Sequence, residues 1–216
     1  LHSVHNPRSQ YQVAYTIDEV LVAPPITYPL TLPMCAPISD GSAAALLCNA
    51  EGLKRLKGDS SRAVKLLSSV VRSSSNRGYE DYKNHLTALA AAEAYEKAGI
   101  APADVDVAEV HDATAMGEII QVENLQLTPY GEAGRAAEQG DFTIGGRVPI
   151  NPSGGLESKG HPIGATGLGQ VYELVTQLRG EAGKRQVDGA RIAIQENGGG
   201  IYGVEEATAA INIFSK

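Results

Sequence analysis

The feature that most constrains the fold is an alternation of helix-patterned and strand-patterned segments along the chain. Residues 84–98 predict a helix because they are rich in alanine, place Leu86 and Leu89 at helical spacing and end at Gly99. Residues 114–127 and 164–179 predict two more helices. Short apolar runs predict strands at 62–72, 105–110, 191–195 and 207–214. Such an alternation is typical of a layered α/β protein.

Two of these helices carry apolar stripes that predict which face is buried. In the helix over residues 114–127, Ala115, Ile119 and Val122 form one row and Met116 and Ile120 form a second, so we expect a wide buried face. In the helix over residues 164–179, the apolar face consists of Leu168, Val171, Val175 and Leu178. Both helices are therefore expected to pack closely on the sheet.

The first 33 residues differ from the rest of the chain. They contain five of the eleven prolines, and proline cannot donate a hydrogen bond to a sheet. We therefore predict an irregular arm over residues 1–33 that packs on another element, and a main domain over residues 34–216. Within that domain, residues 39–41 predict a turn, and a short helix is expected after the apolar run 43–48.

Charge and composition exclude several classes of protein. The net charge of −7 argues against non-specific binding of nucleic acid. No apolar run reaches the 18 to 20 residues that span a bilayer, and no signal-peptide core is seen, so we expect a soluble, cytoplasmic protein without membrane contact. Cys35 and Cys48 lack metal-ligand or disulfide spacing, which predicts two small buried core residues and no metal site.

Three short segments at strand or helix ends predict a site, because layered α/β proteins bind ligands where strands run into loops. They are residues 110–114, 151–167 and 195–200. Glycine and small residues surround His161 in the second segment, and glycine lets a substrate or a second backbone come close. A histidine there is a natural hydrogen-bond donor or base. Residues 198–203 also fit GxGxxG, but too few residues follow to build a dinucleotide-binding unit.

The same segments resemble a known family. Residues 151–167, NPSGGLESKGHPIGATG, resemble the GHP signature of the thiolase superfamily. Residues 110–114, VHDAT, resemble the HDCF motif of its sterol-carrier-protein-2-type branch. Residues 33–47 resemble the opening of that branch's C-terminal half, and residues 177–187 are also typical of it. The resemblance implies the C-terminal half of a layered αβαβα fold.

The resemblance also implies roles for individual residues. Thiolases form an acyl-enzyme on a cysteine that lies in the N-terminal half, so the nucleophile would come from a missing half or from another chain. His161 matches the histidine that activates this thiol, and His111 matches one that helps to form an oxyanion site. The substrate would be contacted by Ala113, Gly160, Asn197, Gly198 and Gly199.

The chain departs from the family where a second catalytic cysteine is expected. Ala113 occupies one of the two positions, and Glu196 occupies the other when the glycines 198–200 are aligned. Burial in a closed pocket would raise the pKa of Glu196 toward about 6 or 7, which suits proton transfer. In the alternative interpretation, Glu196 pairs with Arg147 or Lys159 and only supports the structure.

The leading hypothesis is an acyltransferase that cleaves or forms a β-ketoacyl-CoA, with coenzyme A as substrate or product and no covalent cofactor. The replacement at Ala113 leaves two alternatives. The chain could be a non-catalytic subunit that either binds CoA esters or serves as a scaffold, or it could be an enzyme that carries out retro-aldol or hydrolytic cleavage. The resemblance further implies a homodimer or larger assembly, and a subunit with a zinc ribbon and an OB-fold as a further partner. Degradation of lipid or aromatic compounds is the expected context.

Overall fold

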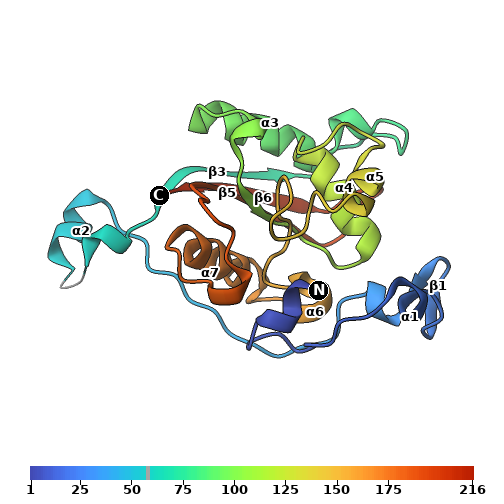
Figure 1. The fold of residues 1–216 in the computed structure, drawn as a ribbon. Coiled ribbons are helices and arrows are strands. Elements are labelled where there is room, and N and C mark those ends of the chain that lie inside the picture. Colours follow the sequence, from blue (N-terminus) through green and yellow to red (C-terminus); the bar gives the residue numbers. More distant parts are fainter. Residues whose placement is uncertain (57–58) are drawn as a thin grey trace.

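The computed structural model describes residues 1–56 and 59–216 and is organised around one mixed four-stranded sheet (Figure 1). The strands lie in the order β3 (Lys65–Ser73), β6 (Thr208–Ser215), β5 (Ile192–Gly199) and β4 (Val107–Glu109). The pairs β3–β6 and β6–β5 are antiparallel, and β5–β4 is parallel. All four predicted strands are confirmed. β5 extends beyond its prediction because Gly198 and Gly199 pair with Ala209 and Thr208 of β6.

Helices cover both faces of the sheet (Figure 1). On one face lie α3 (Leu86–Ala98), α4 (Ala115–Asn124) and α5 (Ala133–Glu138), and on the other lies α7 (Thr166–Leu178), with α6 (Gly155–Lys159) beyond it. A large apolar core that includes Ile194 and Ile211 fills the first interface. A smaller core that includes Leu174 and Phe214 fills the second. The layered α/β prediction is therefore confirmed.

The stripe predictions are wrong in part. Val122 is buried, but Met116 and Ile120 on α4 are 53% and 43% exposed because only one row of this helix meets the core. Leu168 on α7 is also exposed, at 40%, because the start of this helix projects beyond the apolar core. The buried face of α7 carries polar residues as well, among them Gln170.

The N-terminal segment contains short regular pieces rather than a fully irregular arm. These are η1 (His2–His5), α1 (Ile17–Leu21), the hairpin of β1 (Pro25–Thr27) and β2 (Leu30–Thr31), and η2 (Leu32–Met34) at its end. The next helix, α2 (Ala50–Arg55), lies after this segment. The start of α1 is fixed by a capping box in which the Thr16 side chain and Glu19 bond each other's backbone N–H groups. α2 confirms the short helix expected after residue 48. The domain boundary at residue 33 stays a prediction.

Neither cysteine is a core residue, which corrects the prediction. Cys35 is half-buried and Cys48 is exposed, because both lie in the extended segment that precedes the sheet. Residues 128–163 hold the short helices α5 and α6 and are otherwise irregular. The remaining short turns are η3 (Ser60–Arg62), η4 (Tyr82–Asn84), η5 (Pro102–Asp104) and η6 (Gly183–Arg185). Within the described part of the chain, no helix is long and apolar enough to span a bilayer.

Candidate active site

Two histidines from separate segments meet at one end of the sheet. His111 follows β4, and His161 lies between α6 and α7. Their imidazole rings contact edge to face, with centroids 5.0 Å apart and planes at 89°. The structure therefore brings together two of the residues that the sequence nominated.

The ring of His161 is held by the first turn of α7. Nδ1 lies 2.7 Å from the hydroxyl oxygen of Thr166, and this hydroxyl donates its proton to the carbonyl oxygen of Pro162 at 3.1 Å. The hydroxyl must then accept from Nδ1–H, so Nε2 of the neutral ring keeps its lone pair. Burial lowers the pKa of His161, and the charges of His111 and Lys159 lower it further. This ring is neutral near pH 7 and has a basic nitrogen available.

The ring of His111 is held by β5. Nδ1 lies 3.3 Å from the side-chain oxygen of Asn197. Burial lowers the pKa of His111, and the bond to Asn197 partly offsets this effect. Asp112, the next residue, does not hold the ring, because its carboxylate accepts the backbone N–H of Leu156 at 2.7 Å.

Glu196 is completely buried beneath His111. One carboxyl oxygen, Oε2, accepts the backbone N–H of His111 at 2.8 Å, and the other, Oε1, has no hydrogen-bond partner among the described residues. Burial raises the pKa of Glu196 to about 8, although the bond from His111 opposes the rise and the charge of Glu206 adds to it. The pKa of Glu196 is thus raised, as the sequence predicted.

The alternative ion pairs of Glu196 do not form. Arg147 contacts Asp141 at 3.1 Å, and Lys159 lies 3.9 Å from Glu109. Glu196 is therefore a buried carboxyl group that carries a proton near pH 7, rather than one half of a salt bridge.

The small residues nominated by the sequence allow close packing around the histidines. Gly160 has a φ of +114°, and a Cβ atom there would lie 2.7 Å from the hydroxyl oxygen of Ser39. Ser39 in turn accepts the backbone N–H of His161 at 3.2 Å. The carbonyl oxygen of Ala113 accepts the backbone N–H of Ala36 at 3.0 Å, so the segment after Cys35 also borders the site.

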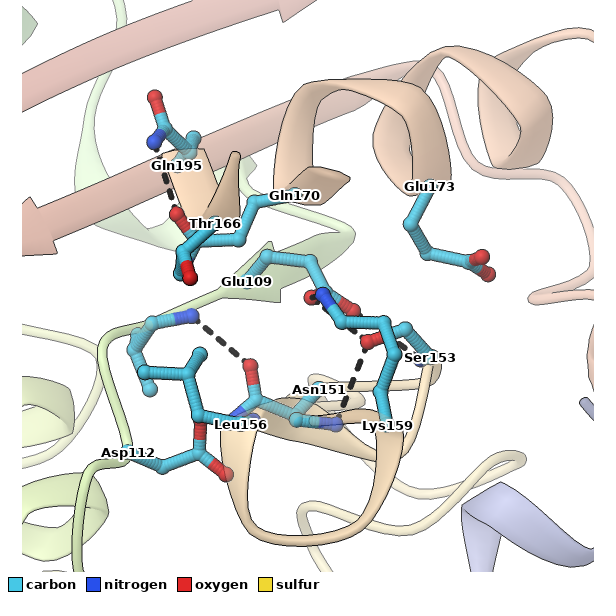
Figure 2. A network of polar contacts seen from close by, with 12 residues as sticks. Glu109, Asp112, Asn151, Ser153, Leu156, Lys159, Thr166, Gln170, Glu173 and Gln195 are labelled. Carbon is cyan, nitrogen blue, oxygen red and sulfur yellow. Dashed lines mark hydrogen bonds and ion pairs between the residues drawn. The ribbon is translucent and has the colours of Figure 1, made fainter. Parts of the chain in front are cut away.

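A buried polar layer supports the loop that carries His161 (Figure 2). Glu109 of β4 accepts the backbone N–H and the hydroxyl of Ser153 at 3.0 and 2.8 Å, and Lys159 points toward it. Burial raises the pKa of Glu109 to about 7, and Lys159 opposes the rise. Gln195 donates to Gln170 at 2.8 Å and links β5 to α7. These contacts fix residues 151–160 against the sheet.

Several residues of the site were missed at the level of sequence. Thr166 lies within the glycine-rich segment, five positions after His161. Because the predicted helix begins there, Thr166 could have been recognised as a first-turn residue close to His161. Ser39 and Glu206 lie far from both histidines in the chain, and no local pattern indicates them. Within residues 1–56 and 59–216, no three His, Cys, Asp or Glu side chains are grouped closely enough to hold a metal ion.

Comparison with known proteins assigns the chain to a family. The family described as "Thiolase C-terminal domain-like" matches residues 68–213. The chain belongs to the thiolase C-terminal domain family. Sterol carrier protein 2 of Oryctolagus cuniculus is 47% identical over 202 residues, which cover 91% of this chain and 37% of that protein. The acetyl-CoA acetyltransferase of Methanothermobacter thermautotrophicus is 43% identical over 98% of this chain and 54% of its own length.

Two further comparisons concern a third relative and a solved structure. Benzoylsuccinyl-CoA thiolase subunit BbsB of Thauera aromatica is 35% identical over 92% of this chain and 52% of that protein. A solved structure titled "Ltp2-ChsH2(DUF35) aldolase" superposes with a TM-score of 0.76 and 19% identity, over 98% of this chain and 55% of that chain, which supports the fold. The thiolase domain described here thus spans between about a third and about half of the length of these relatives.

Proposed function

We propose that this chain is the histidine-bearing half of an acyltransferase that cleaves or forms β-ketoacyl-CoA thioesters. The edge-to-face pair of His111 and His161 carries the proposal. With Nδ1 of each ring occupied by Thr166 or Asn197, Nε2 is the nitrogen that remains for substrate. Two adjacent nitrogens can serve as a base for a thiol and as a hydrogen-bond donor to a thioester oxygen.

In the proposed cleavage, Nε2 of His161 removes the proton of a cysteine thiol that comes from a nucleophile-bearing half or chain. The thiolate attacks the ketone carbon of the β-ketoacyl-CoA, and the bond between the α- and β-carbons breaks. This leaves an acyl-cysteine and the enolate of the shortened acyl-CoA. His111 stabilises the negative oxygen through Nε2–H, the tautomer in which the Asn197 side-chain amide is turned so that its N–H donates to Nδ1.

Glu196 completes the proton balance of the proposed reaction. Its carboxyl group protonates the enolate carbon, which releases the shortened acyl-CoA and leaves a carboxylate. Coenzyme A then transfers its thiol proton to the Glu196 carboxylate and attacks the acyl-cysteine, and the cysteine thiolate recovers the proton held by His161. A buried carboxyl group with a pKa of about 8 suits this exchange near neutral pH. Glu196 would thereby replace the thiol that Ala113 lacks.

The proposed assembly follows from the missing nucleophile. One relative is named as a subunit of a thiolase, which supports an enzyme of more than one chain. We expect the nucleophile-bearing half, a second copy of this chain and acyl-CoA to be the principal partners. A subunit with a zinc ribbon and an OB-fold, a cytoplasmic location and a role in lipid or aromatic degradation belong to the same proposal.

The test is product analysis with the full-length protein and any nucleophile-bearing subunit. A β-ketoacyl-CoA with coenzyme A is expected to yield two acyl-CoA products by mass spectrometry, at a rate that depends on coenzyme A. A free acid would indicate hydrolysis, and cleavage of a β-hydroxyacyl-CoA alone would indicate a retro-aldol enzyme. Binding of CoA esters without any turnover would contradict the catalytic proposal and favour a scaffold.

A further inference from the structure

Residues 6–11, which we call the clasp segment, lie against the part of the chain that leads to His161. The N-terminal end of the chain is beside α6 (Figure 1). Asn6 and Ser9 are buried, and both side chains donate to the carbonyl oxygen of Ser153, at 2.7 Å from Nδ2 and 3.1 Å from Oγ. The hydroxyl of Ser153 donates to a carboxylate of β4 on the other side. The start of α6 is therefore held from two sides.

The clasp segment also holds the end of α6. The backbone N–H groups of Gln10 and Tyr11 donate to the carbonyl oxygens of Lys159 and Ser158, at 3.2 and 2.9 Å. The last carbonyl groups of a helix have no partner within the helix, so donors from outside are needed to fix them. α6 has only five residues, and a helix of this length is not stable by itself. Its position therefore depends on the clasp segment at both ends.

Ser39 connects the clasp segment to His161 itself. Its hydroxyl donates to Oε1 of Gln10 at 2.6 Å, which is nearer than the carbonyl oxygen of Pro37 at 3.2 Å, and it accepts the backbone N–H of His161 at 3.2 Å. These side chains meet where Gly160 has no Cβ, since an added Cβ would lie 2.7 Å from Oγ of Ser39 and 3.2 Å from Oε1 of Gln10. Two hydrogen bonds thus link the clasp segment to the backbone of His161.

The clasp segment reaches α7 as well, the helix that follows His161. The guanidinium group of Arg8 lies over the ring of Tyr172, 4.8 Å from its centroid. The backbone N–H of Arg8 donates to Oδ1 of Asn6 at 3.0 Å, which orders the segment between its two contacts. α7 also carries Thr166, whose hydroxyl holds the ring of His161. One segment therefore contacts the elements that set both the backbone and the ring of this histidine.

We infer that the clasp segment and Ser39 position His161, and that Asn6 and Ser39 are positioning residues for the reaction. The inference deepens the proposed function and rests on it for the role of His161 as a base. Proton transfer requires the cysteine thiol within hydrogen-bond distance of Nε2, so a shift of about 1 Å in the loop lowers the rate steeply. Both residues act through the backbone of residues 153–161 rather than through contact with the substrate.

Asn6→Asp tests the buried end of the clasp segment with little change of shape. The two bonds of the amide require Oδ1 toward Arg8 and Nδ2 toward Ser153. The carboxylate keeps the first bond and replaces the donor of the second with an oxygen that repels the carbonyl. Asn6→Ala introduces no charge and tests the same bond where Asn6→Asp does not fold. Gln186→Ala is the matched control, because it removes a half-buried amide that donates to two carbonyl oxygens beyond the C-terminal end of α7.

The first measurement follows the ring of His161 without reference to activity. NMR of the full-length protein with labelled histidine, and with any nucleophile-bearing subunit, detects the ring-current shifts that the edge-to-face rings of His111 and His161 impose on each other. His161→Gln assigns the signals. Asn6→Asp and Ser39→Ala are expected to shift them, whereas Ser39→Thr, which keeps the hydroxyl, and Gln186→Ala are expected to leave them in place. Unchanged signals in Asn6→Asp or in Ser39→Ala would overturn the inference.

The second measurement is the rate of acyl-enzyme formation together with the steady-state constants. Asn6→Asp and Ser39→Ala are expected to lower the acylation rate and kcat by about 10-fold or more with an unchanged KM, because the base is displaced while the substrate contacts remain. Ser39→Thr is expected to retain most of the rate. Gln186→Ala is expected to keep the wild-type kcat even where its melting temperature falls as far as that of Asn6→Asp.

The outcomes separate the inference from the proposed function. Wild-type acylation rates in Asn6→Asp and Ser39→Ala would overturn the role of the clasp segment even in an active enzyme. An equal loss of kcat in Gln186→Ala would also overturn it, because the loss would then follow stability alone. A protein that does not cleave β-ketoacyl-CoA, but whose histidine signals move as expected, would overturn only the proposed function.

Discussion

The imidazole rings of His111 and His161 meet at 5.0 Å and 89°, although one follows a strand and the other precedes a helix. Each ring is anchored through Nδ1, one by Asn197 and the other by Thr166. The pair is therefore a preorganised arrangement in which β5 and α7 set the positions of two reactive nitrogens. Its chemistry depends as much on these anchors as on the histidines themselves.

Thr166→Val is expected to misplace the ring of His161 and lower kcat by about 100-fold, because small errors of position have large effects on proton transfer. Thr166→Ser keeps the hydroxyl and is expected to retain most of the activity. Thr176→Val is the matched control, since its hydroxyl bonds only the carbonyl of Tyr172 within α7. Steady-state kinetics of the three variants check the prediction, and equal losses in Thr166→Val and Thr176→Val would argue against a specific anchor.

His111→Ala is expected to lower turnover by about 100-fold or more through loss of an oxyanion donor. His111→Asn is expected to retain part of the activity, because an amide can donate to the same oxygen. The measurement is kcat on a β-ketoacyl-CoA for both variants. An active alanine variant beside an inactive asparagine variant would contradict the assigned role.

Glu196→Gln is expected to change how stability depends on pH. The folded-state pKa of about 8 lies above the ordinary value of 4.5, so the folded protein holds a proton that the unfolded chain releases. The stabilisation is complete below pH 4.5 and is lost as the pH rises toward 8. The variant lacks this loss, so its free energy of unfolding is expected to decline less than that of the wild type between pH 5 and 8. Denaturant titrations across this range provide the test, and parallel pH profiles would show that Glu196 is not protonated.

Gly160→Ala is expected to disturb the loop that carries His161. Its φ of +114° is strained for any residue with a side chain, and the added Cβ would contact Ser39 at 2.7 Å. Both the melting temperature and kcat are expected to fall. Gly189→Ala also has a positive φ, of +74°, but meets no neighbouring atom, so it controls for backbone strain alone. A loss of kcat no greater in Gly160→Ala than in Gly189→Ala would refute the positional effect.

Much of the fold could be predicted because the strands are short apolar runs and α3 ends at a left-handed glycine, Gly99. The errors arose where an apolar residue has no core to meet. Met116 and Ile120 fit the helical stripe but lie outside the packed row. Cys48 was expected to be buried because cysteine is usually internal, whereas its segment stands away from the sheet.

The candidate site was predictable only in its local motifs. The glycine-rich surroundings of His161 are continuous in sequence, and so is the position of Glu196 ahead of Gly198. The contact of Glu206 with Gly198 and the approach of Ser39 to Gly160 depend on long-range packing that no local pattern specifies. The roles of His111, His161 and Glu196 stay predictions until they are measured.

The most direct measurement of the central claim is the formation of an acyl-enzyme, followed by mass spectrometry of the intact full-length protein with any nucleophile-bearing subunit. On incubation with an acyl-CoA, the wild type and Glu196→Gln are expected to gain one acyl group on a cysteine at similar rates, while His161→Ala gains none. Glu196→Gln is then expected to lose about 100-fold in the complete reaction, because only the carbon proton transfer needs its carboxyl group. Acylation of His161→Ala at the wild-type rate, or complete turnover of Glu196→Gln at the wild-type rate across pH 6–8, would contradict the account.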